Sequence, residues 1–290
     1  MVRLDDFGEA SRLAFQCIKP GVLTNHVMTA DEYREDIESG TFYAHTWPGG
    51  VLFLRDRGGY NLLSYYIIDT NVVPDCELPD DTVTEIAYKP SGAEAAERAI
   101  RFWEITGLNI AFERIRLTRL ETADKSGIGN AAVGIPFQCR GLLLPGFALN
   151  IAIFQDLDDC QKLMQANFDP ITGHIPTSNE IETSIAEGCI LCLKDSFGKI
   201  CGLLRCVQRA ASVEIRQLAL REDVRGQGLA RQLLDIFIEK WGSGKSTVWM
   251  RDGNVPALKA YNSAGFTADG WRSAVMRKPH NPKAESLSSN

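Results

Sequence analysis

The sequence predicts an α/β (α+β) protein with two domains, each built on a mixed, mostly antiparallel sheet flanked by helices. Its 290 residues suffice for two domains of ordinary size, and 44% of them are hydrophobic. In the second half, short apolar runs typical of strands alternate with amphipathic segments typical of helices. We expect a first domain over residues 1–145, a second over 146–278 and a flexible tail over 279–290.

Charge and hydropathy argue against several classes of partner. The chain has 37 acidic and 31 basic residues, a net charge of -6, so no overall positive field attracts nucleic acid or an anionic membrane. No apolar run approaches the ~20 residues that span a bilayer, and the acidic, interrupted amino terminus does not resemble a secretory signal. We therefore expect a cytoplasmic protein that binds neither nucleic acid nor membranes.

The second half predicts a regular succession of elements. Strands are expected over residues 149–154, 189–193, 200–208, 213–220, 247–250 and 271–276, and helices over 160–168, 178–188, 228–241 and 254–264. The helix over 228–241 carries apolar residues at three- and four-residue spacing, from Leu229 to Trp241. This continuous apolar stripe predicts that the helix lies on a sheet.

The eight cysteines are interpreted as reduced thiols. Cys189 and Cys192 have the spacing of a zinc-binding pair, but neighbouring residues of a strand point to opposite faces, so these two thiols should diverge. We expect no metal site. Cys192 also lacks a base or cation nearby in sequence that would make it a nucleophile.

A glycine-rich segment joins the strand over 213–220 to the apolar-striped helix. Its sequence is Arg225-Gly226-Gln227-Gly228-Leu229-Ala230. The glycines let the backbone approach a phosphate, and the free amides at a helix start bind its oxygens. Arg225 adds a guanidinium suited to phosphate. Taken alone, the segment also fits a tight turn.

A second segment follows on a helix after one intervening strand, Asn254-x-x-Ala257-x-x-x-Tyr261-x-x-x-Gly265-Phe266. Together the two segments, in this order of elements, resemble the GNAT family of N-acetyltransferases over residues 146–278. In that family the first segment is the pyrophosphate-binding motif, and Arg225, Gly228 and Ala230 occupy its fixed positions here. The resemblance implies the GNAT fold and acetyl-CoA as co-substrate, without a metal.

The resemblance also implies which residues touch the co-substrate. In the family, the strand matching 213–220 splays from the next one, and its unpaired backbone groups bind pantetheine and polarise the thioester carbonyl. The positions implied to bind acetyl-CoA are Leu218, Ala219, Leu220, Arg225, Gly226, Gln227, Gly228, Leu229, Ala230 and Asn254.

Two residues are candidates for the chemistry. Tyr261 matches the family tyrosine that lies near the thioester sulfur and would protonate the departing thiolate. Its alternative is a packed core residue, because it follows Leu258 by three on its helix. Glu214 matches a strand position at which some members carry a general base, and its alternative is a solvated strand glutamate.

The first half shows short matches to the second in the same order. Residues 36–40 match 184–188, residues 52–56 with Gly59 match 191–195 with Gly198, and residues 84–86 match 213–215. On this alignment residues 88–94 replace the arginine-glycine segment and lack its glycines, ahead of a helix over 95–105. We therefore expect tandem GNAT-like domains whose first copy has lost acetyl-CoA binding; an unrelated α+β substrate-binding domain is the alternative.

The leading functional hypothesis is an enzyme that transfers acetyl from acetyl-CoA to a primary amine of a small molecule or peptide. One alternative is a protein acetyltransferase acting on lysine or on an amino terminus. Another is a non-catalytic sensor that binds acyl-CoA. We favour a monomer, because tandem domains can mimic the pairing that single-domain members achieve by dimerising.

Overall fold

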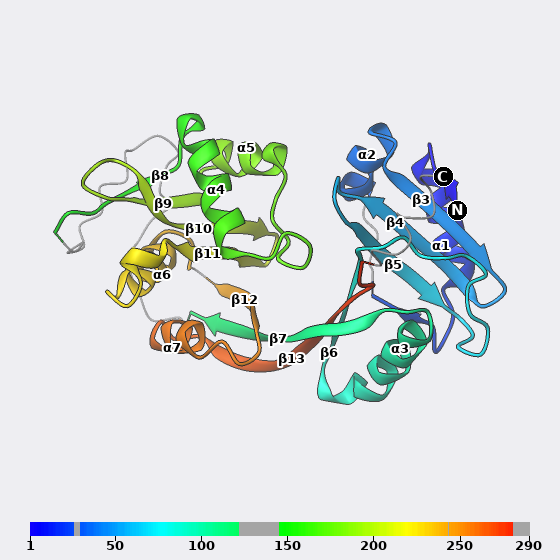
Figure 1. The fold of residues 1–290 in the computed structure, drawn as a ribbon. Coiled ribbons are helices and arrows are strands. Elements are labelled where there is room, and N and C mark those ends of the chain that lie inside the picture. Colours follow the sequence, from blue (N-terminus) through cyan, green and yellow to red (C-terminus); the bar gives the residue numbers. More distant parts are fainter. Residues whose placement is uncertain (26–29, 122–144, 243, 281–290) are drawn as a thin grey trace. The chain divides into compact units, whose positions relative to one another are not determined.

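The structure, a computed structural model, describes residues 1–25, 30–121, 145–242 and 244–280. The chain forms two compact units, Met1–Arg114 with Gly270–Asn290 and Ile115–Asp269 (Figure 1). It passes between them twice, within β7 (Asn109–Leu120) and within β13 (Thr267–Arg277). The boundaries predicted from sequence, at 145 and 278, differ from this division. The segment predicted to connect the domains, 125–145, lies almost wholly outside the described residues.

The first unit is a sheet with helices on both faces. Its strands follow in space as β1 (Val2–Arg3), β3 (Phe42–Trp47), β4 (Gly50–Asp56), β5 (Asn61–Ile67) and β6 (Thr82–Tyr88). These pairs are antiparallel except for the parallel pair of β5 and β6. Residues 272–277 of β13 pair antiparallel with β6, so the last strand of the chain belongs to the unit that begins it. Pairing between segments so distant in sequence leaves no local signal, which is why the predicted boundaries missed it.

Alternation along the strands sends apolar side chains of the first unit to two cores. Val51 and Phe53 of β4 pack with helices α1 (Phe7–Cys17) and α2 (Ala30–Glu38), and Leu52 and Leu54 pack with α3 (Ala93–Ile105). Each of these four side chains is at most 2% exposed. The helices therefore cover opposite faces of one sheet.

The second unit repeats this plan. Its strands follow as β8 (Ala148–Ile151), β9 (Ile190–Lys194), β10 (Ile200–Arg209), β11 (Ser212–Leu220) and β12 (Lys245–Arg251), with β7 beside β12. The first pairs are antiparallel and β11 pairs parallel with β12. Its helices are α4 (Leu157–Asn167), α5 (Ser178–Ala186), α6 (Leu229–Trp241) and α7 (Val255–Ser263). Every strand and helix predicted for residues 149–276 is present, with bounds shifted by a few residues.

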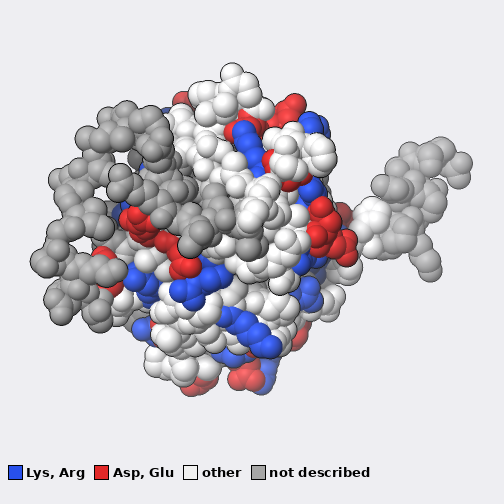
Figure 2. All heavy atoms as spheres, turned by 90° about the vertical axis from the view of Figure 1, so that its left-hand side faces the viewer, with Lys and Arg blue, Asp and Glu red and all other residues white. Residues whose placement is uncertain are grey.

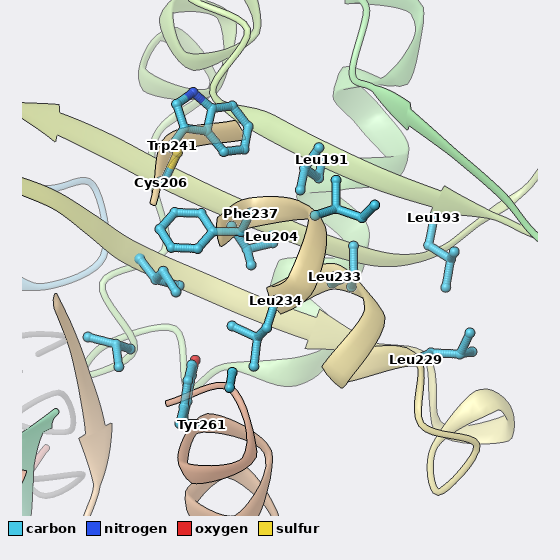
Figure 3. Close-up of a cluster of buried hydrophobic side chains, with 14 of the residues drawn as sticks. Leu191, Leu193, Leu204, Cys206, Leu229, Leu233, Leu234, Phe237, Trp241 and Tyr261 are labelled. Carbon is cyan, nitrogen blue, oxygen red and sulfur yellow. The ribbon is translucent and has the colours of Figure 1, made fainter. Parts of the chain in front are cut away.

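The apolar stripe of α6 lies on the sheet as predicted. Leu233, Leu234 and Phe237 are 0% exposed and face Leu204 and Leu191 of the strands (Figure 3). The opposite face of the sheet is covered by α4 and α5, whose apolar residues form a separate core.

The buried cysteines of the second unit divide between these two cores. Cys189 packs in the core beneath α6 together with Cys206, whereas Cys192 lies on the other face with its sulfur 3.4 Å from that of Cys160 on α4. The predicted divergence of Cys189 and Cys192 is confirmed. The hydrogen bond with Cys160, and then burial, raise the pKa of Cys192, which keeps it a neutral thiol.

The parallel pair locates equivalent strands in the two units and corrects the alignment of the first half. Each of β5 and β11 pairs antiparallel with the strand before it and parallel with the next strand in the sheet, so β5 corresponds to β11. The sequence alignment, which matched residues 84–86 to 213–215, is therefore wrong by one strand. The counterpart of the arginine-glycine segment is residues 68–81, which contain turns and no helix, rather than residues 88–94.

In the first unit the space beside β5 is occupied by the chain itself. Where β5 leaves β6, β2 (Leu23–Thr24) pairs antiparallel with it through Ile67 and Tyr66. Asn25 continues this contact, since its Nδ2 donates to the Leu63 carbonyl at 3.1 Å and its Oδ1 accepts from the Tyr65 amide at 3.1 Å. The peptide edge of β5 is thus satisfied by residues of the same chain.

We expect replacement of Phe237 by alanine to destabilise the second unit by about 3–5 kcal/mol, because the ring is fully buried and its loss leaves a cavity. Phe197→Ala is the matched control, since Phe197 is 88% exposed and should cost less than about 0.5 kcal/mol. Chemical denaturation of both variants measures the difference. Equal losses would contradict the packing described for α6.

Candidate functional site

Strand β11 contains a bulge at the point where it separates from β12. The register of β10 and β11 pairs Arg205 with Gln217 and then Cys206 with Ile215, so Arg216 is an extra residue on β11. Bulges bend a strand and increase its twist. The parallel pairing of β11 with β12 ends at Ile215 and Val248, although β11 continues to Leu220. Its peptide groups on the β12 side beyond Ile215 therefore lie past the last strand pair.

The predicted backbone positions Leu218, Ala219 and Leu220 all lie in this separated part of β11. Ala219 is buried under α4, and Leu218 and Leu220 pack partly against the core under α6. Because these side chains pack into the two cores, it is the backbone of residues 218–220 that faces the space between β11 and β12. An extended ligand can pair with such an edge as an added strand.

The arginine-glycine segment starts α6 at the end of this strand. Gly226 and Gly228 have φ of 77° and 80°, a left-handed conformation that favours glycine. A Cβ built on either glycine meets no atom within 4 Å, so the segment borders open space. Leu229 anchors the first turn of α6 in the core at 1% exposure. The free amides of that turn therefore face an accessible surface, as anion binding requires.

Arg225 joins three elements around the segment. Its Nε donates to the carbonyl of Leu220 at 3.2 Å, and its Nη2 donates to Oδ1 of Asn167, the last residue of α4, at 2.8 Å. The Leu220 carbonyl is thus engaged by the loop arginine. Asn167 was missed from sequence, because it belongs to no motif and lies far from the loop along the chain.

A second arginine braces the turn before the segment. Arg221 donates to both carboxylate oxygens of Asp223, at 2.7 and 2.9 Å, and to Asp195 of the β9–β10 hairpin at 3.0 Å. These hydrogen bonds from Arg221 lower the pKa of Asp223. Gln227 adds a contact from its Nε2 to the Asp223 carbonyl at 3.3 Å. The backbone path into α6 is therefore fixed from several sides.

Tyr261 lies on α7 beside the core under α6 (Figure 3). Its side chain is 5% exposed, and its ring packs edge-on against Phe266 with centroids 5.7 Å apart. Burial raises the pKa of the phenol, so the hydroxyl keeps its proton at neutral and moderately alkaline pH. Both interpretations of Tyr261, core residue and proton donor, are compatible with this position.

Glu214 precedes the bulge on β11. Its side chain is 17% exposed, and Oε1 accepts from Nη1 of Arg216 at 2.8 Å, while Arg209 lies 3.9 Å from Oε2. The carboxyl group is therefore oriented by two arginines rather than freely solvated. Asn254 caps α7, because its Oδ1 accepts from the Ala257 amide at 3.2 Å.

Charges are mixed on the face of the molecule seen in Figure 2, where Lys and Arg lie among Asp and Glu over the residues drawn in colour. Among the described residues no group of three or more His, Cys, Asp or Glu is arranged to hold a metal ion. Nor, in that part of the chain, does any helix have the length and hydropathy needed to cross a membrane.

Comparison with known proteins agrees with this geometry. Residues 186–268 match the family model of the acetyltransferase (GNAT) domain, a segment that contains α6, the arginine-glycine loop and α7. No curated protein matches the sequence.

Two solved structures share the fold. A GCN5-related N-acetyltransferase from Sphaerobacter thermophilus aligns with a TM-score of 0.53 at 14% identity, over 79% of this chain and 76% of that one. A GNAT-family acetyltransferase from Colwellia psychrerythraea aligns with a TM-score of 0.52 at 13% identity, over 96% of this chain and 97% of that one. The predicted fold class is confirmed.

We expect wild-type protein to bind one acetyl-CoA per chain and Gly228→Glu to weaken binding by roughly 100-fold or more, since the change strains the loop and puts a carboxylate beside the phosphates. Gly58→Glu is the control, because Gly58 has φ of 70° and equally open surroundings in a hairpin of the first unit. Calorimetric titration measures both. Unchanged binding in Gly228→Glu, or two sites per chain, would contradict the assignment.

Proposed function

We propose, from the GNAT acetyltransferase domain that the chain carries at residues 186–268, that the protein transfers acetyl from acetyl-CoA to a primary amine. The separation of β11 from β12 next to the loop of Arg225 carries this proposal. Adjacent sites for an extended amide chain and for phosphates match the pantetheine and pyrophosphate of one ligand.

Two parts of acetyl-CoA, the pantetheine arm and the pyrophosphate, have binding groups in the proposal. The pantetheine amides pair with the backbone of β11 beyond Ile215, like an added strand. The pyrophosphate binds the amides that start α6, where the helix dipole favours negative charge. Arg225 stands beside these amides and supplies positive charge.

In the reaction the amine nitrogen attacks the thioester carbonyl carbon, a C–N bond forms and the C–S bond breaks. The amine loses a proton and the departing thiolate gains one, so the products are an N-acetyl compound and CoA. Backbone amides of β11 stabilise the oxyanion of the intermediate. Tyr261, whose burial keeps the phenol protonated, donates to the thiolate. Glu214 accepts the amine proton, directly or through water.

A specific observation favours the alternative of a non-catalytic acyl-CoA sensor. Tyr261 is 5% exposed and packed against Phe266, as a core residue would be. The sensor would bind acetyl-CoA as tightly as the enzyme and release no CoA with any amine. Assay of CoA release over an amine panel separates the two functions.

We expect Tyr261→Phe to lower kcat by about 100-fold while leaving acetyl-CoA affinity and thermal stability nearly unchanged, because only the proton donor is removed. Steady-state kinetics with calorimetry and thermal unfolding would check this. An unchanged kcat would assign Tyr261 to the core alone.

We expect Glu214→Gln to lower kcat by about 100-fold at neutral pH, with a smaller effect at high pH where the free amine needs no base. The pH profile of kcat measures this difference. Glu182→Gln on α5, an exposed position, is the control. A loss that stays the same at every pH would contradict a base role for Glu214.

A further inference from the structure

Arg205 is a buried cation held by neutral partners. It lies on β10 and is 8% exposed. Its Nε donates to Oγ of Ser184 on α5 at 2.8 Å, and its Nη1 donates to Oε1 of Gln217 on β11 at 3.1 Å. Among the described residues no carboxylate forms an ion pair with it, and no hydrogen bond engages its Nη2.

This arrangement is costly. Removing a charge from water without an opposite charge is among the most unfavourable steps in folding. Burial, and then the neighbouring Arg216, lower the pKa of Arg205, although a guanidinium stays protonated in proteins. The carboxylate of Glu180 attracts the guanidinium, but from farther away than an ion pair. A link between β10 and α5 alone could be made by a neutral donor such as glutamine.

Arg205 lies next to the part of β11 that is separated from β12. Arg205 is paired in register with Gln217, the residue that follows the bulge and precedes Leu218. Gln217 in turn donates from Nε2 to the carbonyl of His174, in the connection between α4 and α5, at 3.0 Å. The guanidinium therefore sits on the α4–α5 face of the sheet, where β11 begins to diverge from β12.

We propose that Arg205 binds a carboxylate of the acceptor, so that the substrate is an amino acid or another amine bearing a carboxylate. This inference rests on the proposed function, because it places the acceptor beside the acetyl group bound along β11. Ser184 and Gln217 orient the guanidinium, and Nη2 is left for the ligand. A carboxylate supplies the opposite charge that the site lacks. Arg205 takes no part in the bonds that form and break.

The test compares matched acceptors on the full chain. Alanine, phenylalanine and lysine are each assayed beside their primary amides and decarboxylated amines, with CoA release as the readout. Wild-type protein should prefer at least one acid over its amide by roughly 10- to 100-fold in kcat/KM. Arg205→Gln should remove this preference by raising KM for the acid, with kcat/KM for the amide and the KM for acetyl-CoA unchanged. Arg205→Lys should restore part of it.

Two controls separate recognition from structure. Arg101→Gln changes an exposed arginine of α3, outside the proposed site, and its preference should equal that of wild type. Binding of N-acetyl amino acids and of their amides to the CoA-loaded wild type is measured by calorimetry, which requires neither turnover nor a folded variant.

The outcomes for the two proposals differ. A wild type that binds acetyl-CoA and releases no CoA with any amine contradicts the enzyme. A wild type that does not distinguish acids from amides, in turnover or in product binding, overturns the role of Arg205 even if the enzyme is active. A loss shared equally by acids and amides in Arg205→Gln also overturns it.

Discussion

The candidate site depends on one constraint, the extra residue Arg216 that β11 inserts opposite β10. The insertion shifts the register with β10 and directly follows Ile215, the last residue of β11 that pairs with β12. A strand that continues without a neighbour exposes peptide groups that must find partners. In the second unit these groups lie beside the start of α6, and the proposed co-substrate supplies the missing partners.

In the first unit Leu23, Thr24 and Asn25 fill the equivalent position of β5. The same divergence thus leaves the edge of β11 without a partner strand in one unit and the edge of β5 paired with its own chain in the other.

In the first unit, the paired edge of β5 and the absence of a helix in residues 68–81 both argue against a co-substrate site. Where the second unit has the arginine-glycine loop and α6, the first has residues 68–81 without a helix. It therefore lacks both the helix amides for phosphate and the free strand edge for an amide chain. The loss of acetyl-CoA binding by the first copy stays a prediction, and it now rests on different residues from those that the sequence alignment chose.

Local signals explain how much could be predicted from sequence. The stripe of α6, its glycines and the cap at Asn254 are properties of short segments, so the helices, strands and loop of residues 149–276 could be predicted from them. The roles of Asn167 and Arg205 depend on hydrogen-bond partners in other elements, so no spacing in the sequence predicts them. The alignment of the first half failed because strands of similar composition are distinguished by their pairing directions. Asn25 could not be identified because a side chain that replaces a strand partner has no pattern of its own.

The pairing of residues 272–277 of β13 with β6 has a consequence for how the protein is made. A ribosome delivers the first unit's opening strands long before the strand that pairs with β6. Until residues 272–277 have been synthesised, β6 lacks this partner strand, and its edge is exposed to other chains and to chaperones. The first unit can therefore be completed only after the second unit has been synthesised. A single cut of the gene between the two halves would separate β6 from its partner strand.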